Sequence, residues 1–226
     1  MARAGDAAEP RRDVNVLFLD EHLLAVDKPS GLIVHRGWAD DEDTAVDRAR
    51  AIAGDVYPMH RLDRGTSGVL LFARSSEIAS LLGAQIASNQ KRYVCAVRGR
   101  PPTEGVIDSP VRRGEEPEPR VPAVTRFRLI ATSPIARYSL VEARPETGRL
   151  HQIRRHMKHA THPILGDVRY GKREHNHFCR EHFGLNRMAL HAASLTITHP
   201  VSGDVLVLEA LLPEDLRAPL TAMQLL

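Results

Sequence analysis

The sequence of 226 residues is poor in cysteine and has no long apolar run. Its two cysteines, Cys95 and Cys179, lie far apart and form no disulfide framework, which fits a reducing compartment. No stretch approaches the roughly 20 apolar residues of a membrane-spanning helix. Residues 1–13 mix arginines with acidic residues and lack the apolar core of a signal peptide. We therefore expect a soluble, cytoplasmic protein with a flexible tail over residues 1–13.

Repeats and nucleotide-binding loops are also missing. The sequence contains no fixed-period repeat, no Walker loop and no Gly-x-Gly-x-x-Gly after a predicted strand, so a nucleotide cofactor has no support. A chain of this length, with 42% hydrophobic residues, can bury one substantial core. We expect a single domain over residues 14–226.

Strand patterns outnumber helix patterns along the chain. Strands are predicted at residues 14–19, 23–26, 69–73, 91–97, 125–130, 137–143, 188–198 and 205–210, and helices at 44–53, 75–89, 147–159 and 213–223. Residues 101–123 hold six prolines and are expected to form a long exposed excursion. Residues 169–186 are expected to form a polar, His-rich loop. Together these patterns indicate an α+β fold with a mixed, mostly antiparallel central sheet flanked by helices and loops.

Positive charge is concentrated in one region. Formal net charge is only +3, but residues 144–187 contain ten Lys or Arg against four Asp or Glu, and seven of the twelve histidines. Such an excess is typical of a surface that binds a polyanion, although a solvated basic face would look the same.

Residues 60–68 read HRLDRGTSG and are followed at once by the apolar run 69–73. Asp63 lies between Arg61 and Arg64, and neighbouring arginines favour the charged form of a carboxylate. The Thr, Ser and Gly that follow are turn residues, whereas the apolar run is typical of a buried strand. A charged surface loop would explain the arginines alone. The combination of carboxylate, turn and core strand favours a functional site at Asp63.

Five motifs occur in order along the chain. They are residues 60–68 (HRLDRGTSG), 91–93 (KRY), 147–154 (TGRLHQIR), 162–167 (HPILGD) and 190–192 (LHA). Together they resemble the RluA family of RNA pseudouridine synthases, and the resemblance runs over residues 14–212. Residues 35–38 and 181–185 resemble the TruC branch of that family, which modifies uridine 65 of transfer RNA. Because residues 1–13 leave no room for the N-terminal S4-type module of many family members, we expect the catalytic domain alone.

The resemblance implies a reaction in which uracil is detached from its ribose, turned over and rejoined through carbon. Breaking a glycosidic bond calls for a carboxylate near the anomeric carbon. Asp63 is the candidate, either adding to the sugar or removing a proton from it. Arg149 is expected to pair with Asp63 and hold it charged and oriented. Tyr93 is expected to stack on the uracil and help remove the proton at the new carbon bond; from its pattern alone, core packing would be the commoner role.

The same resemblance implies a target nucleotide that is flipped out of its helix. Arg61 is expected to fill the vacated stack or hold flanking phosphates, and Arg64 is expected to face the RNA. Arg154 is expected to contact the RNA backbone. Gln152 falls in the first turn of a predicted helix, where a phosphate is favoured. Leu190 is expected to make an apolar contact under the base.

A metal site has little support in the sequence. His175, His177, Cys179 and His182 lie within eight residues, but their spacing matches no common zinc pattern. The resemblance also implies a reaction without metal or cofactor. We expect this segment to face RNA instead.

RNA is therefore the expected partner, with tRNA favoured, and a monomer is expected. Three alternatives remain open. The chain could act on ribosomal RNA, alone or besides tRNA; it could be a non-catalytic RNA-binding module of the same fold; or it could be a glycosylase that releases free uracil.

Overall fold

The computed structural model describes residues 14–36, 43–85, 90–113 and 119–226. The expected tail, residues 1–13, lies outside these ranges. The strands are β1 (Asn15–Leu19), β2 (Leu23–Lys28), β3 (Tyr57–Pro58), β4 (Ser67–Ala73), β5 (Gln90–Arg98), β6 (Glu104–Asp108), β7 (Val111–Arg112), β8 (Arg120–Val121), β9 (Val124–Thr132), β10 (Tyr138–Pro145), β11 (Leu190–Thr198) and β12 (Val205–Glu209). The helices are α1 (Ala45–Ala53), α2 (Ser76–Gln85), α3 (Gln152–His159), α4 (Arg173–Phe183) and α5 (Glu214–Ala222).

One long sheet organises these elements, in the order β1-β2-β4-β11-β5-β10-β9-β6. Strand β12 also pairs with β11, and β3 with β4. All of these pairs are antiparallel except β4 with β11, which is parallel. The expected α+β fold with a mixed, mostly antiparallel sheet is confirmed.

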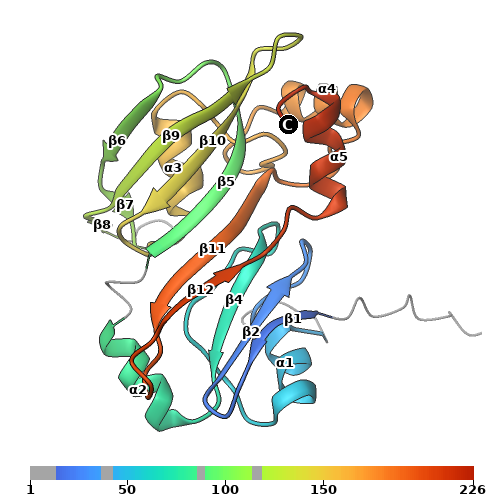
Figure 1. Ribbon diagram of the computed structural model, residues 1–226. Coiled ribbons are helices and arrows are strands. Elements are labelled where there is room, and N and C mark those ends of the chain that lie inside the picture. The colour runs from blue at the N-terminus through green and yellow to red at the C-terminus, as the bar shows by residue number, and fades with distance from the viewer. Residues whose placement is uncertain (1–13, 37–42, 86–89, 114–118) are drawn as a thin grey trace, which may run out of the picture.

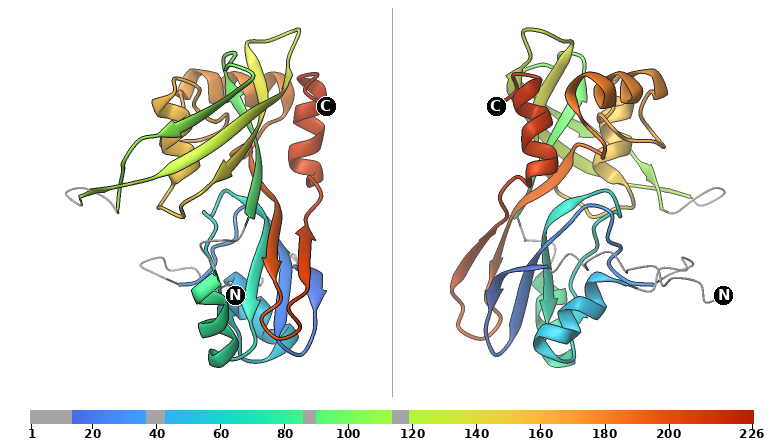
Figure 2. Two further views of the ribbon diagram at one scale, coloured as in Figure 1. Left: turned by 60° about the vertical axis from the view of Figure 1, so that its left-hand side comes forward. Right: turned by 90° about the vertical axis from the view of Figure 1, so that its right-hand side faces the viewer.

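Figure 1 shows the sheet as two halves joined by β11 and β5. The lower half contains β1, β2 and β4 with α1 and α2, and the upper half contains β6, β9 and β10 with α3. The side views show α4 and α5 beside the upper half (Figure 2). The two halves meet where β11 passes between β4 and β5.

The apolar sequence of β4 follows from burial on both faces. Leu70 and Phe72 pack in one cluster with α1, whereas Val69 and Leu71 pack in a second cluster with α2. Alternate residues of a strand point to opposite faces, so a strand covered on both sides must be apolar throughout. This rigid strand carries the loop that contains Asp63 at its N-terminal end.

The upper half has its own core between the sheet and α3, α4 and α5. Ile153 and Met157, four residues apart on one face of α3, are buried in it. Tyr93 of β5 packs against both this core and the cluster under α1. It therefore lies at the junction of the two halves.

Two segments expected to lack regular structure contain it. Residues 101–123 include β6, which pairs with β9 and extends the sheet, so that part is not an exposed excursion. Within 169–186, α4 replaces the expected loop because Cys179 is fully buried and Phe183, four residues later, packs on the upper core. Because histidines occupy its other faces, this short apolar stripe does not give a recognisable helical pattern in the sequence.

Among the helices of the described residues, none has the length and apolar character needed to cross a membrane.

Gly68 is required by the parallel pairing of β4 with β11. Its φ of +112° is strained for any other residue, and an added Cβ would lie 2.2 Å from the carbonyl oxygen of Ala192. Backbone strain and overpacking each amount to about 1–3 kcal/mol. We predict that Gly68→Ala lowers the free energy of unfolding by at least about 2 kcal/mol in chemical denaturation.

Gly83→Ala is the matched control. Gly83 lies within α2, and nothing lies within 4 Å of the place that a methyl group would take there. Alanine should therefore stabilise the helix by about 0.5–1 kcal/mol. Equal effects from both substitutions would contradict the close approach of β4 and β11.

Candidate active site

A cleft of about 640 Å³ opens at the junction of the two halves. Its walls come from the loop before β4, from β5, and from the segment that leads into α3. Among the residues that line it are Arg61, Asp63, Tyr93, Arg149, Gln152, Arg154 and Leu190. The fold thus brings together seven of the eight site residues predicted from the sequence. Arg64, the eighth, is exposed and is not part of the lining.

Asp63 is paired with Arg154. Arg154 Nη1 donates to Asp63 Oδ2 at 2.9 Å, and its Nε and Nη2 donate to Asp167 at 2.7 and 2.9 Å. Asp63 retains 19% side-chain exposure, whereas Asp167 has none. Arg154 therefore anchors a cleft carboxylate to a buried one, which it holds through a bidentate contact.

Electrostatics support this chain of charges. Burial alone would lower the pKa of Arg154, but its bonds to Asp167 and Asp63 raise that pKa above its ordinary value. Burial would likewise raise the pKa of Asp167, yet Arg154 and the N–H groups of Tyr170 and Arg169 hold it below its usual range. Both groups stay charged, so the orienting contact persists at any ordinary pH.

The predicted pairing of Asp63 with Arg149 is wrong. Arg149 is exposed, and its Nε donates to the carbonyl oxygen of Pro122 at 3.3 Å. The physical reason is the start of the helix, which lies at Gln152 rather than at Thr147. Arg149 precedes the helix and points along the rim of the cleft, while Arg154 lies on the first turn and faces Asp63.

His151 sets this helix start. It adopts a left-handed conformation, with φ 52° and ψ 28°, immediately before α3. Its Nδ1 lies 3.1 Å from the Tyr170 hydroxyl, and its Nε2 lies 3.7 Å from Asp63 Oδ1. Burial lowers the pKa of His151 to about 4, so its ring is neutral at pH 7. A neutral imidazole therefore lies beside the second oxygen of Asp63.

Gln152 has a different role from the one expected. Its Oε1 accepts from Thr147 Oγ1 and from the Arg149 N–H at 2.7 and 3.0 Å. Its Nε2 donates to Val124 O and Thr125 Oγ1 at 2.9 and 3.0 Å. These bonds use the full capacity of a side-chain amide. Gln152 thus fixes the rim segment on which Arg149 lies, which favours a positioning role over the predicted substrate contact.

Tyr93 and Leu190 supply the apolar part of the cleft. Leu190 begins β11 and pairs in register with Cys95, two residues beyond Tyr93 on β5. Burial, and then the negative charge of Asp63, raise the pKa of Tyr93 well above its ordinary value. Because Asp63 acts on the Tyr93 hydroxyl in this way, the carboxylate and the phenol belong to one site.

The Asp63 loop is held from behind by a buried lysine. Lys28 has no exposed surface, and its Nζ donates to the carbonyl oxygens of Leu32 and Pro29 at 2.7 and 2.8 Å and of Arg64 at 3.4 Å. Ser30 adds a bond from its hydroxyl to Gly65 O at 3.0 Å. Lys28 is the last residue of β2, and nothing in the sequence singles it out.

His60 supports the same loop. Its Nε2 accepts from the Leu71 N–H at 3.2 Å, and burial lowers its pKa to about 3. On the other side, Arg187 Nη2 donates to Ser67 Oγ at 2.7 Å. The segment that carries Asp63 is therefore fixed from three directions.

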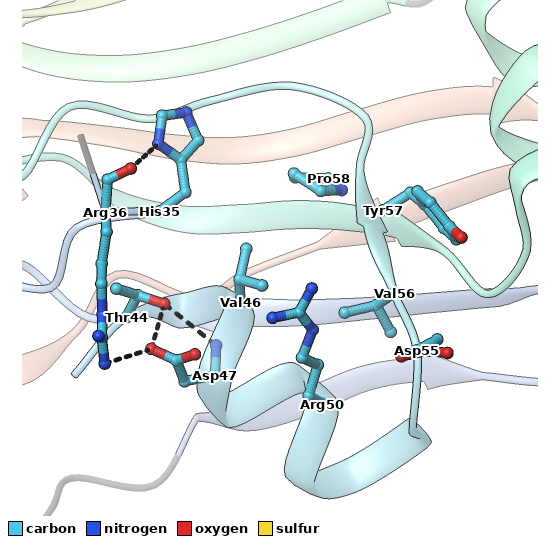
Figure 3. Close-up of a pocket in the computed structure, with 10 residues that line it drawn as sticks. All are labelled: His35, Arg36, Thr44, Val46, Asp47, Arg50, Asp55, Val56, Tyr57 and Pro58. Atoms are coloured by element: carbon cyan, nitrogen blue, oxygen red, sulfur yellow. Dashed lines mark hydrogen bonds and ion pairs between the residues drawn. The ribbon is translucent and has the colours of Figure 1, made fainter. Parts of the chain in front are cut away.

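A second hollow, of about 480 Å³, lies beside α1 and β3 (Figure 3). There Thr44 caps α1 by accepting from the Asp47 N–H, and Arg36 lies 3.8 Å from the Asp47 carboxylate. Tyr57 is its exposed aromatic residue. None of the five sequence motifs contributes to its lining, so the cleft around Asp63 is the candidate active site.

Comparison with known proteins identifies the family. Residues 22–159 match the family model for RNA pseudouridylate synthases. A protein of Haemophilus ducreyi called tRNA pseudouridine synthase C is 40% identical over 225 residues, covering 90% of this chain and 93% of its own length. The chain belongs to the RNA pseudouridylate synthase family.

Two further relatives agree. A Pectobacterium carotovorum protein with the same name is 43% identical over 87% of this chain; the chain spans 58% of that relative's length. The solved structure of human RNA pseudouridylate synthase domain containing 4 has a TM-score of 0.75 at 25% identity, with 93% of each chain covered. Membership of the family makes the protein an isomerase that acts on RNA.

Within the synthase, α4 carries the histidines that raise the question of zinc. Cys179 is buried in the upper core, and His175 Nδ1 lies 3.3 Å from the Tyr138 hydroxyl. His182 stacks on Phe178 with ring centroids 4.1 Å apart. The described residues contain no group of three or more His, Cys, Asp or Glu arranged to hold a metal ion.

Four residues that matter to the site have roles that the sequence does not predict. Arg154 is predicted as a backbone contact, and Asp167, His151 and Lys28 have no predicted role. Arg154, His151 and Asp167 lie within the five motifs, and membership of a motif is the sequence feature that could have marked them as functional. The partners themselves depend on the fold, because Asp63 and Arg154 are 91 residues apart.

Arg154→Met tests the pairing in the synthase. It leaves the Asp63 and Asp167 carboxylates without their guanidinium, and removing one partner of a buried ion pair lowers stability by about 3–5 kcal/mol. We predict a loss of that order in chemical denaturation, together with a loss of pseudouridine formation of at least about 100-fold. Arg149→Met, a matched removal at the exposed rim, should change stability by less than about 0.5 kcal/mol. If Arg154→Met and Arg149→Met lowered the free energy of unfolding equally, the pairing of Asp63 with Arg154 would be contradicted.

Lys28 predicts a pH dependence of stability. Burial lowers its pKa to about 7 in the folded protein, from an ordinary 10.5. Between these values the unfolded chain binds more protons, so the free energy of unfolding should rise with pH by roughly 1 kcal/mol per unit. Denaturation at pH 7 and 9.5 should show this rise in the native protein and a smaller one in Lys28→Met. Identical slopes would contradict the lowered pKa of the buried Lys28 side chain.

Proposed function

We propose that this synthase isomerises a uridine in tRNA to pseudouridine, at position 65, with Asp63 as the essential carboxylate. The position of Asp63 in the cleft, held by Arg154 and beside Tyr93, is the observation that carries the proposal. The target is supported by the tRNA pseudouridine synthase C relatives and by the resemblance of residues 35–38 and 181–185 to the TruC branch.

Asp63 acts on the ribose of the target nucleotide. Oδ2 is occupied by Arg154, while Oδ1 faces the neutral His151 ring at a longer distance. Arg154 thus fixes Oδ2, and Oδ1 is the oxygen that can act on the sugar. Both open routes, addition to the sugar and removal of a proton from it, need a charged carboxylate held in one orientation. A carboxylate that rotated freely would reach the sugar less often.

Tyr93 and Leu190 hold the uracil. An aromatic ring and an apolar side chain on adjacent strands β5 and β11 form two contacts for a flat base. Flipping the nucleotide out of its helix takes a few kcal/mol, and these contacts offset part of that amount. We expect the Tyr93 hydroxyl, which lies in the same cleft as Asp63, to take part in removing the proton at the new carbon bond.

Arg61 and Arg149 are exposed on the rim of the cleft, where they can hold the strand that flanks the flipped nucleotide. Arg64 is exposed outside the lining, and in this proposal it faces the RNA beyond the rim. The reaction needs no cofactor in this scheme, since the base is retained and no water enters. In this proposal residues 14–226 act as one catalytic domain, as a monomer in the cytoplasm.

Asp63→Ala tests the function. The side chain is partly exposed and its loop is held by other residues, so the variant should fold as the native protein does. We predict that it forms no detectable pseudouridine and releases no tritium from tRNA transcripts labelled at C5 of uridine. Undiminished product would contradict the role of Asp63, and free uracil among the products would favour a glycosylase.

Mapping of pseudouridines in total RNA, from cells with and without the gene, tests the target. We predict loss at tRNA position 65 alone. Loss confined to a ribosomal site would overturn the tRNA proposal while leaving the family and the catalytic residues in place.

A further inference from the structure

Lys91 lies inside the cleft, and nothing in the proposed chemistry uses it. It is on β5, two residues before Tyr93, so both side chains point to the same face of the strand. Both line the cleft. A methyl group built on Gly148 would lie 4.0 Å from Lys91 Nζ. The ammonium therefore reaches from β5 to the opposite wall, where the Thr147–Arg149 rim segment begins.

This ammonium has no anionic partner within the described part of the chain. The neighbouring Arg92 pairs with Glu142 and Glu209 on the other face of β5, and Arg154 takes Asp63. For Lys91 there is neither a hydrogen bond nor an ion pair among the described residues, although its side chain is half-buried. Burial lowers its pKa, and no carboxylate opposes that effect.

A buried charge without a partner destabilises the free protein. The other buried lysine of this site, Lys28, at least donates to three carbonyl oxygens, whereas Lys91 has no hydrogen-bond partner among the described residues. A second unmatched group lies in the same cleft: Thr66 Oγ1 is buried and has no hydrogen-bond partner among the described residues. Unsatisfied polar groups that line one cleft indicate that a ligand supplies their partners.

We propose that Lys91 binds a phosphodiester group of the RNA strand that carries the target nucleotide. Among the groups of an RNA, the phosphates alone carry full negative charge, and a compact ammonium binds them as a point charge. Lys91 is two residues from Tyr93 on β5 and is half-buried, whereas Arg61 and Arg149 on the rim are exposed, so this contact lies on the Tyr93 wall of the cleft. The inference rests on the proposed RNA substrate and deepens it by assigning an anion site inside the cleft.

Lys91→Met separates binding from folding. The variant keeps the length and apolar stem of lysine but removes the charge. We predict that the melting temperature of the free protein rises by about 2 °C, because an uncompensated charge is lost. Binding of a tRNA transcript should weaken roughly five- to tenfold at 0.1 M KCl, and the slope of log Kd against log salt should fall by about 0.7–0.9, which is one phosphate contact. Lys91→Arg should restore the slope.

Arg217→Met is the control. Arg217 is exposed on α5 and pairs with Glu214, so its loss changes net charge equally and should leave the salt slope unchanged. An unchanged slope in Lys91→Met, or a lower melting temperature, would overturn the proposal and make Lys91 a structural residue. Failure of the native protein to form pseudouridine in the same transcript would instead contradict the proposed function.

Discussion

The guanidinium of Arg154 is the contact on which the site depends. It joins two carboxylates that belong to different parts of the fold: Asp63, on the loop before β4, and Asp167, on the turn after α3. Asp167 is fully buried and also accepts hydrogen bonds from two backbone N–H groups. It is therefore the fixed member of the Asp63–Arg154–Asp167 network. Because Arg154 is held by Asp167, it can hold the Asp63 carboxylate in one orientation across the junction.

Each half of the sheet carries one partner of the Asp63–Arg154 contact. The lower half supplies Asp63 on the loop that leads into β4, a strand buried on both faces, and the upper half supplies Arg154 on α3, a helix packed over β9 and β10. Tyr93 and Leu190 lie on β5 and β11, which connect the halves. The close pairing of β4 with β11 through Gly68 sets how near the halves approach. The geometry of the site is therefore a property of the whole sheet.

Local chemistry explains which features the sequence predicts well. The apolar run of β4, the spacing in α3 and the turn at Asp63 each depend on neighbouring residues. The partner of Asp63 does not: it depends on a helix start set by one left-handed histidine, His151, which periodicity does not reveal. Likewise α4 has the sequence of a polar loop because its buried stripe is short. The motifs contain the right residues, but their partners depend on the fold.

The central claim is that Arg154 and Asp63 are energetically coupled. A double-mutant cycle tests it most directly, with the free energies of unfolding of the native protein, Asp63→Ala, Arg154→Met and the double variant. The account predicts a coupling energy on the order of 1–3 kcal/mol, because the two side chains share one largely buried contact. Additive effects, with a coupling energy near zero, would contradict it.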